Sequence, residues 1–443
     1  MEEIAIARNC LQLARESGAE QVRITLNKSV TNLAGMLNGE LDKVSRSLDR
    51  SLALNLFVDG RYGSFSTNRL DEAALPDFVR ESIATVRMLA PDPCRALPDP
   101  ARTAKDAQTG RELDLFDPAV DALTPAERLS IAERSCLFAR KSALEKGFTL
   151  LSEEGEYSDS LFDTVVLDSN GLFARHTETS FEIGYELTIA SPDGHRYSGF
   201  WWDASPRLEQ LQWRDCSEKA LQRAAAQIGP QPDRGGRMNL VVDSECASKL
   251  LNPLLAALGG YAVQQKNSFL ADKLGEALFP PCLSVVDRPH EAGQTGSRLF
   301  DSEGVATRER PIIDKGVVST FFLNSYIARK LGMEPTVEDA VRPCVVPFGG
   351  CRTREDVLRK MDSGILVTGF NGGNSNSSTG DFSYGIEGFR FAGGKIVHPV
   401  REMLVTGNFI TLWKQLALTG DDARPCLSRR IPTLAFTGVD FSG

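Results

Sequence analysis

Residues 22–58 read VRITLNKSVTNLAGMLNGELDKVSRSLDRSLALNLFV, and this stretch decides the fold. Apolar and polar side chains alternate along it, as they do in half-buried strands. Asn38-Gly39 lies inside the stretch and Asp59-Gly60 follows it directly, and both are dipeptides of primed two-residue hairpin turns. The stretch therefore predicts an antiparallel sheet with strands at 22–27, 33–37, 41–47 and 51–58.

Helices are predicted on both sides of these strands. Apolar residues recur at helical spacing in residues 2–17, and Gly18 stands where a left-handed helix cap is expected. A second helix is predicted at roughly 72–89. The result is one unit made of a helix, antiparallel strands and a helix.

The same pattern restarts after a proline-containing linker. Thr124-Pro125-Ala126-Glu127 is a capping box with proline at the first helical position, which predicts a helix to about residue 146. Strands follow, with Asn170-Gly171 and Asp193-Gly194 as turns, and a last helix is predicted at 207–227. Prolines, which interrupt continuous helices and central strands, mark the linker: Pro91, Pro93, Pro98 and Pro100.

Matched landmarks of the two units are separated by similar distances along the chain. The offset is 129 from Gly18 to Gly147, and 132 between the two Asn-Gly turns. This spacing is typical of a duplicated unit, although common turn dipeptides also match by coincidence, and both interpretations stay open. The expected domains are a unit at 1–90, a linker at 91–123, a second unit at 124–234 and a C-terminal domain at 235–443.

The C-terminal domain is expected to be mostly β. Glycine becomes more frequent from residue 235, a short strand is predicted at 239–242, and a helix is predicted to begin at Asp243 or Ser244. Hairpins are predicted around residues 314–316 and around Gly393-Gly394. The expected fold class is α+β.

Composition excludes several classes of function. With 59 acidic and 50 basic residues, the formal charge is −9, which disfavours direct binding to nucleic acid. Nine cysteines without a C-x-x-C pair predict reduced thiols and a cytoplasmic location. Residues 1–3 are acidic where a signal peptide carries positive charge, so no signal peptide is expected. The apolar segment 250–263 is too short to cross a membrane and is interrupted by polar, proline and glycine residues. No membrane segment is expected.

Sites of recognisable chemistry are scarce. Only four histidines occur, and none falls in H-E-x-x-H spacing, so no metal site is expected. A second set of possible metal ligands consists of His290, Glu291, Asp301 and Glu303. Because charged residues in such a loop are more often solvated, a solvated surface is the favoured interpretation over a metal site. No G-x-S-x-G nucleophile elbow is present.

The most biased segment is 369–380, GFNGGNSNSSTG. It lacks the spacing of a nucleotide-binding loop, and a structured connection is the simpler interpretation. Glycine also allows close approach of a ligand, and amides and hydroxyls bond peptide backbones. The candidate peptide-binding residues, expected to line a cavity, are Gly372, Gly373, Asn374, Asn376 and Ser378.

Four parts of the chain resemble the TldD/PmbA family of gyrase modulators. They span nearly the whole sequence and read VDGRYGS at 58–64, SRLFDSEGVAT at 297–307, GGN at 372–374 continuing through TGDFS at 379–383 and GF at 388–389, and VRE at 400–402 with TGN at 406–408.

The resemblance implies a chain without the family's zinc site. In the TldD type, H-E-x-x-x-H on a helix holds zinc, with a further cysteine near the C-terminus. The corresponding segment here, 250–260, reads LLNPLLAALGG, whose aliphatic side chains neither bind zinc nor move a proton. Cys426 lies near the position of the ligand cysteine and is interpreted as structural. The chain is thus similar to the PmbA or TldE type.

For that type the resemblance implies a noncatalytic subunit of a zinc metalloprotease that processes unfolded peptides. Zinc is then expected only in a TldD-type partner, with this chain in a heterodimer or, alternatively, a homodimer. A regulatory or adaptor protein of the gyrase-modulator kind is the second hypothesis. An independent hydrolase is the third.

Overall fold

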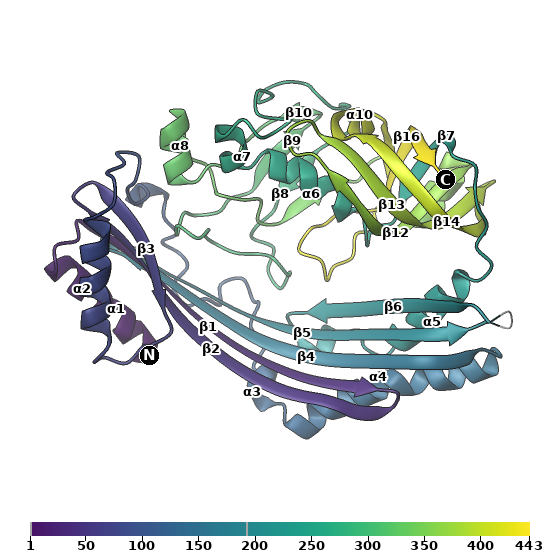
Figure 1. The fold of residues 1–443 in the computed structure, drawn as a ribbon, viewed down its shortest axis with the longest axis horizontal. Coiled ribbons are helices and arrows are strands. Elements are labelled where there is room, and N and C mark those ends of the chain that lie inside the picture. Colours follow the sequence, from purple (N-terminus) through teal and green to yellow (C-terminus); the bar gives the residue numbers. More distant parts are fainter. Residues whose placement is uncertain (1, 192–193) are drawn as a thin grey trace. The chain divides into compact units, whose positions relative to one another are not determined.

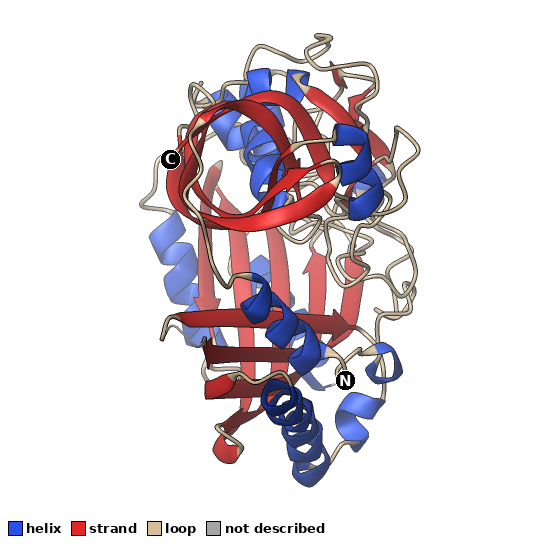
Figure 2. Ribbon diagram, turned by 90° about the vertical axis from the view of Figure 1, so that its right-hand side faces the viewer, coloured by secondary structure: helices blue, strands red, loops and turns tan. Residues whose placement is uncertain are grey.

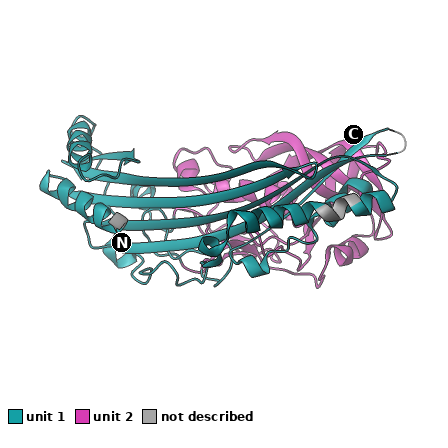
Figure 3. Cartoon of the chain, turned by 90° about the horizontal axis from the view of Figure 1, so that it is seen from below, with its two compact units in different colours: residues 1–225, 290–307, 324–337 teal, residues 226–289, 308–323, 338–443 magenta. Residues whose placement is uncertain are grey.

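The computed structural model describes residues 2–191 and 194–443, and the chain divides into two compact units (Figure 3). Unit 1 comprises residues 1–225, 290–307 and 324–337, and unit 2 comprises residues 226–289, 308–323 and 338–443.

Unit 1 is built on one antiparallel sheet of six long strands in the order β3-β2-β1-β4-β5-β6 (Figure 1). The strands are β1 (Gln21–Leu37), β2 (Glu40–Val58), β3 (Arg61–Thr67), β4 (Thr149–Asp168), β5 (Phe173–Ala190) and β6 (Arg196–Ser205).

The four short strands predicted in 22–58 are wrong in number, because the structure has two. Pairing of β1 with β2 continues without a break from Gln21↔Phe57 to Gly35↔Lys43. The polar residues 27–32 lie within this ladder. Ladder hydrogen bonds come from the backbone, so polar side chains do not end a strand whose neighbours continue.

The predicted hairpin turns are confirmed at both ends of β2. Asn38 and Gly39 have φ of 51° and 81°, and Asp59 and Gly60 have φ of 50° and 70°. Two consecutive left-handed residues are the conformation of a type I′ turn. Asn170-Gly171 lies in the connection from β4 to β5, and the predicted turn at Asp193 lies outside the described residues.

Helices cover parts of this sheet and link its strands (Figure 1). The capping box is confirmed, since Thr124 accepts from the Glu127 backbone and Glu127 accepts from Thr124. The helix predicted at 207–227 is shorter, because a 3₁₀ turn at Leu208–Gln210 precedes it. The α-helices are α1 (Glu2–Glu16), α2 (Leu75–Val86), α3 (Ala119–Ala122), α4 (Pro125–Glu145), α5 (Cys216–Ala226) and α8 (Ser325–Leu331).

The two halves of the sheet have the same element order. One half runs α1-β1-β2-β3-α2, and the other runs α4-β4-β5-β6-α5 with α3 before it. They meet at the antiparallel pair β1–β4. Each first hairpin also contacts the start of the other half: Asn38 N donates to Glu153 O at 2.9 Å, and Ser169 N donates to Val22 O at 2.8 Å. This reciprocity is what a duplicated unit with a local two-fold relationship produces.

Unit 2 contains a second sheet in the order β14-β13-β12-β7-β16-β15. An additional pairing of β14 with β16 closes it into a barrel, visible as a ring of strands in Figure 2. The strands are β7 (Gly236–Val242), β12 (Gly364–Ser375), β13 (Asp381–Ala392), β14 (Lys395–Asn408), β15 (Leu416–Thr419) and β16 (Leu434–Ser442).

The rest of unit 2 consists of short helices and a four-stranded sheet. The helix predicted at Asp243 or Ser244 begins later, at Ser248, because turns occupy residues 244–247. The predicted hairpin is confirmed by left-handed Lys315 and Gly316. The elements are α6 (Ser248–Ala257), α7 (Gly260–Gln264), α9 (Arg354–Met361), α10 (Phe409–Lys414), β8 (Val285–Asp287), β9 (Arg310–Asp314), β10 (Val317–Val318) and β11 (Pro343–Val345).

The α+β class is confirmed, with antiparallel sheets in the N-terminal region and a β-rich C-terminal region. Gly393 and Gly394, both left-handed, make the other predicted hairpin between β13 and β14. Within the described residues, every helix is too short or too polar to cross a membrane.

Candidate functional site

The biased segment 369–380 is mostly strand. Residues up to Ser375 belong to β12, and the connection to β13 covers only 376–380. Polar and glycine residues had indicated a loop, but bulges after Val367 and after Phe370 accommodate them within the ladder. Residues 371–379 are exposed. A signal that would have revealed the strand is the Phe370, Phe382 and Tyr384 aromatic pattern on both sides of the turn.

One side of this strand is unpaired. The parallel pairing of β12 with β7 ends at Val367, whereas its pairing with β13 continues to Ser375↔Phe382. Among the described residues, no strand pairs with the other side of 369–375. The segment therefore presents outward backbone N–H and C=O groups in strand geometry, which is a template for an added strand.

The two candidate glycines are not equivalent. Gly373 has φ of 98°, and a Cβ there would lie 2.0 Å from the Ser383 carbonyl oxygen. Glycine is therefore required by packing at this position. Gly372 has φ of 149°, and a Cβ there would meet no atom within 4 Å. Gly372 thus borders open space, where a ligand backbone has room.

The candidate asparagine and serine residues also have different roles: two of them hold the turn, and one lies beside the unpaired edge. Asn376 Oδ1 accepts from the Ser378 backbone N–H at 2.9 Å, and the Ser378 hydroxyl bonds Asn267. These two side chains hold the turn together, as Asx turns do. Asn374 is exposed and lies opposite Ser383. It is the member of the set that presents an amide beside the unpaired edge.

The end of the turn is anchored by Asp381. Asn408 donates to it at 2.9 Å and Thr379 at 2.7 Å, and these two hydrogen bonds hold the pKa of its carboxyl below the usual value. Next to it, an aromatic cluster packs in the barrel. The ring of Phe382 stacks on that of Phe409, with 4.7 Å between ring centroids, and on that of Tyr384, with 5.3 Å between ring centroids. The turn is therefore held in place by the hydrogen bonds of Asp381 and by the packed aromatic rings beside it.

Helix α6 occupies the place in the sequence where the resemblance puts a zinc-binding helix. Most of its apolar residues are in the core, with Leu250, Leu251 and Leu254 fully buried. Trp413 Nε1 donates to the Leu250 carbonyl at 3.3 Å. The leucines of this helix therefore contribute core packing.

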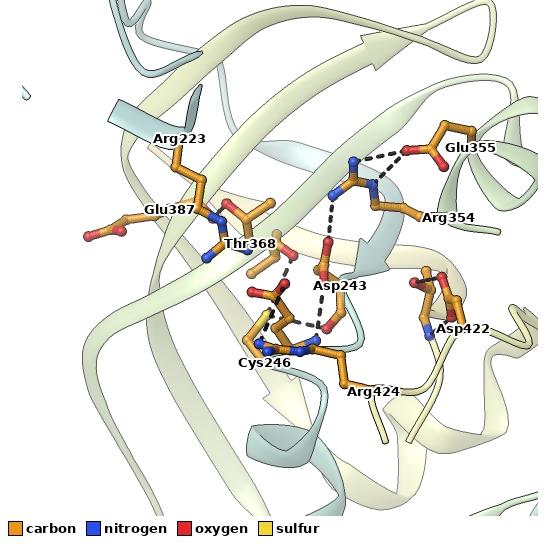
Figure 4. A network of polar contacts seen from close by, with 12 residues as sticks. Arg223, Asp243, Cys246, Arg354, Glu355, Thr368, Glu387, Asp422 and Arg424 are labelled. Carbon is orange, nitrogen blue, oxygen red and sulfur yellow. Dashed lines mark hydrogen bonds and ion pairs between the residues drawn. The ribbon is translucent and has the colours of Figure 1, made fainter. Parts of the chain in front are cut away.

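A charged network lies where β7 ends and the turns before α6 begin (Figure 4). Arg354 bonds the buried Asp243 carboxylate at 2.7 Å and Glu355 at 2.9 Å, while Arg424 lies 4.0 Å from Glu245. Each of these three carboxylates faces a guanidinium, an arrangement that offsets their charge and ties α9 to the residue that follows β7.

The remaining sequence candidates have structural partners. His290 Nε2 lies 2.8 Å from the Thr307 hydroxyl, Glu303 accepts from the Ser325 backbone, and Asp301 accepts from two backbone N–H groups. Cys426 is buried. Within the described part of the chain, no three His, Cys, Asp or Glu residues are placed to share a metal ion.

A pocket of about 350 Å³ lies on the sheet of unit 1, and sequence reasoning had not identified it. Strands β4, β5 and β6 line it, and no residue of 369–380 does. The predicted cavity beside that segment remains a prediction. The side chains at this pocket are acidic and aromatic: Glu154, Glu156, Glu182, Glu186, Phe200 and Trp202.

Comparison with known families assigns the class. Three models of PmbA/TldA metallopeptidase domains match the chain: domain 1 at residues 22–86, the central domain at 118–228 and the C-terminal domain at 235–443. The chain belongs to the PmbA/TldD family.

Individual relatives resemble it over almost the full length. Metalloprotease PmbA of Escherichia coli O157:H7 is 29% identical, covering 97% of this chain and 94% of that protein. A crystal structure from Bacteroides thetaiotaomicron, named for modulation of DNA gyrase, is 38% identical with a TM-score of 0.93, covering 99% of this chain and 98% of that one. TldE of Thermococcus kodakarensis shares the fold, with a TM-score of 0.85 at 20% identity over 99% of this chain and 100% of that one.

Proposed function

We propose that this chain is the noncatalytic, PmbA/TldE-type subunit of a zinc metalloprotease complex that cleaves unfolded peptides. In this proposal a TldD-type partner carries the zinc, and this chain holds the peptide. The similarity to proteins named metalloprotease PmbA supports the metallopeptidase family, and the aliphatic α6 supports the noncatalytic role.

The observation that carries the peptide-holding role is the unpaired edge of β12 at 369–375. An extended peptide adds to such an edge through backbone hydrogen bonds, and these bonds are tolerant of sequence because every residue except proline offers the same N–H and C=O groups. Gly372 leaves room for a peptide backbone, and Asn374 offers an amide beside it. Unfolded substrates have free backbone groups, which folded proteins lack.

The experiment is a peptide assay with the chain alone and with a TldD-type partner. We expect cleavage of an unstructured peptide only in the mixture. Gly372→Val places bulk in the open space along the edge and should weaken peptide capture by the complex at least fivefold. Gly393→Val is the matched control, because Gly393 is also left-handed, with no atom within 4 Å of a Cβ.

Two outcomes of this assay would contradict the proposal. Equal peptide affinity in a folded Gly372→Val complex would make the segment a structural connection only. Cleavage by this chain alone would favour an independent hydrolase.

A regulatory role is the second candidate, favoured by the 38% identical structure named for modulation of DNA gyrase. A net charge of −9 makes protein contacts, not DNA contacts, the route for such an effect. A change in the supercoiling activity of purified gyrase on adding this chain, without any peptide cleavage in the mixture, would support the adaptor over the protease subunit.

A further inference from the structure

The pocket on the sheet of unit 1 lies on the face opposite the covering helices α4 and α5. On β4, Gly155 faces α4, because a Cβ there would lie 2.5 Å from the Cys136 sulfur. On β6, Trp201 faces α5, with the Arg223 guanidinium 4.5 Å from its ring centroid. Side chains alternate along a strand, so the neighbours of these two residues point to the other face. Those neighbours line the pocket: Glu154, Glu156, Phe200 and Trp202.

Gly184 of β5 forms the floor of the pocket. In the ladder it stands between Glu156 of β4 and Trp202 of β6, and it adds no side chain between the carboxylate and the indole. The nearest atom to a Cβ at this position would belong to the Phe200 ring, at 3.6 Å. The pocket volume of about 350 Å³ falls within the range of ligand sites, roughly 300–1,000 Å³.

Four carboxylates surround this floor, two from β4 and two from β5: Glu154, Glu156, Glu182 and Glu186. Within the described part of the chain, no three of them are placed to share a metal ion. Carboxylates that are spread around aromatic rings suit a wide organic cation, because a metal ion needs its oxygen ligands within one small coordination shell. The lining therefore indicates a cation of the guanidinium or alkylammonium kind.

One cation of the chain already lies among these carboxylates. Lys43 Nζ is 2.7 Å from Glu156 and 3.9 Å from Glu154. The hydrogen bond to Glu156 and the charge of that carboxylate raise the pKa of Lys43. Glu182 accepts from a serine hydroxyl, and within the described side chains neither Glu182 nor Glu186 has such a counter-ion. The pocket thus keeps an excess of negative charge.

The outer position of β6 favours a peptide as the carrier of the cation. β6 pairs with β5 and, among the described residues, with no strand on its other side. Phe200 on this strand is 46% exposed. A peptide that lies along β6 bonds it through backbone groups and turns every second side chain to the face of the pocket.

We propose that this pocket binds the guanidinium group of an arginine side chain carried by a peptide, stacked on Trp202 or Phe200 and donating to Glu186. A guanidinium is always charged, stacks on aromatic faces and donates two parallel hydrogen bonds to a carboxylate. The aromatic and acidic lining supplies both kinds of contact. This inference is independent of the protease role proposed above.

Two peptides that differ in one group test the role of charge. One is a short alanine peptide with blocked termini and a central arginine, and the other has citrulline, which has nearly the same shape without the charge. Isothermal titration calorimetry with the full chain should show roughly tenfold weaker binding of the citrulline peptide. The edge of β12 offers backbone contacts that both peptides use equally, so the difference between them reports on the pocket alone.

Filling the floor tests the location. Gly184→Val leaves the charges unchanged, and the variant should fold because a Cβ has room there and β-branched residues suit strands. We expect it to bind the arginine peptide roughly tenfold more weakly. Glu186→Gln should weaken binding roughly fivefold. Glu133→Gln, an exposed change on α4, is the matched control and should leave binding unchanged.

Lys43→Gln should have the opposite effect. It removes the chain's own cation from Glu156, so one more carboxylate becomes available to the peptide. We expect roughly threefold tighter binding of the arginine peptide. Spermidine, a free organic cation, should bind the parent chain at least about tenfold more weakly than the arginine peptide, because it has neither the planar guanidinium nor a peptide backbone.

Three results would overturn the inference. The first is equal affinity of the parent chain for the arginine and citrulline peptides. The second is unchanged affinity for the arginine peptide in a Gly184→Val variant that keeps the parent circular dichroism spectrum. The third is tighter binding of spermidine than of the arginine peptide, which would make the occupant a free polyamine. None of them bears on peptide capture at β12, so the two proposals fail separately.

Discussion

Asn32 of β1 stands directly opposite Asp159 of β4 and donates a 2.8 Å hydrogen bond to its buried carboxylate. Arg128 of α4 bonds the same carboxylate, with Nη2 at 3.0 Å from Oδ1, and the Tyr157 hydroxyl donates at 3.1 Å. The pair lies where the two halves of the sheet meet. One carboxylate therefore joins both halves of the sheet to the helix that covers them.

Replacing Asp159 should destabilise unit 1 strongly. Asp159→Ala leaves the Arg128 guanidinium, about nine-tenths buried, without its counter-charge, at a cost of about 3–5 kcal/mol in the free energy of unfolding. Urea unfolding followed by circular dichroism measures the change. Arg80→Ala removes an exposed ion pair with Asp77 and should change stability by less than about 1 kcal/mol. Similar effects for the two variants would refute the central role of Asp159.

Gly373 and Gly372 should respond differently to alanine. At Gly373 the new Cβ would lie 2.0 Å from the Ser383 oxygen, so the β12–β13 ladder must shift. At Gly372 only the backbone conformation opposes the change. We expect Gly373→Ala to cost about 1–3 kcal/mol more than Gly372→Ala. Thermal melts compare them, and equal melting temperatures would contradict the packing argument.

Asp163 should contribute stability that depends on pH. Burial raises the pKa of its carboxyl. Arg175 lowers that pKa through hydrogen bonds and its positive charge, Thr177 lowers it through a hydrogen bond, and together they outweigh burial, so the pKa is lowered overall. A carboxyl with a lowered pKa stabilises the fold above its unfolded value of about 3.9, and this contribution is lost as pH falls through the folded pKa.

Asp163→Asn should therefore be less stable than the parent at pH 7, and the difference should shrink as pH falls below about 4. Urea titrations over a series of pH values measure it. A difference that stays constant from pH 7 to the acid limit would mean that the Asp163 charge is not the cause.

The isolated chain should bind no stoichiometric zinc, because the segment 250–260 offers aliphatic side chains in place of ligands. Elemental analysis after dialysis measures the metal. About one zinc per chain, lost on replacing Cys426 or His290, would reveal a substitute site. A complex with a TldD-type partner should contain the same amount of zinc per partner subunit as the isolated partner does.

The sequence predicted local features well. The turns at Asn38-Gly39 and Asp59-Gly60, the Thr124 capping box and the Gly393-Gly394 hairpin all follow from neighbouring residues. The α+β class followed from periodicity, and the family followed from residue identities spread along the chain. The domain boundaries at 90, 123 and 234 and the peptide-binding residues stay predictions.

By itself, the sequence determined the left-handed turns at Asn38-Gly39, Asp59-Gly60 and Gly393-Gly394, the cap at Thr124, and the lack of H-E-x-x-x-H in 250–260, because these depend on residue identity and on contacts within a few residues. Only the tertiary structure decided that residues 22–58 form two long strands, that β1 pairs with β4, and that β14 meets β16. Those pairings join distant segments through backbone groups that every residue shares, so residue type does not specify the partner. For the same reason, the edge of β12 at 369–375, with which no strand of the described residues pairs, was visible only in the fold.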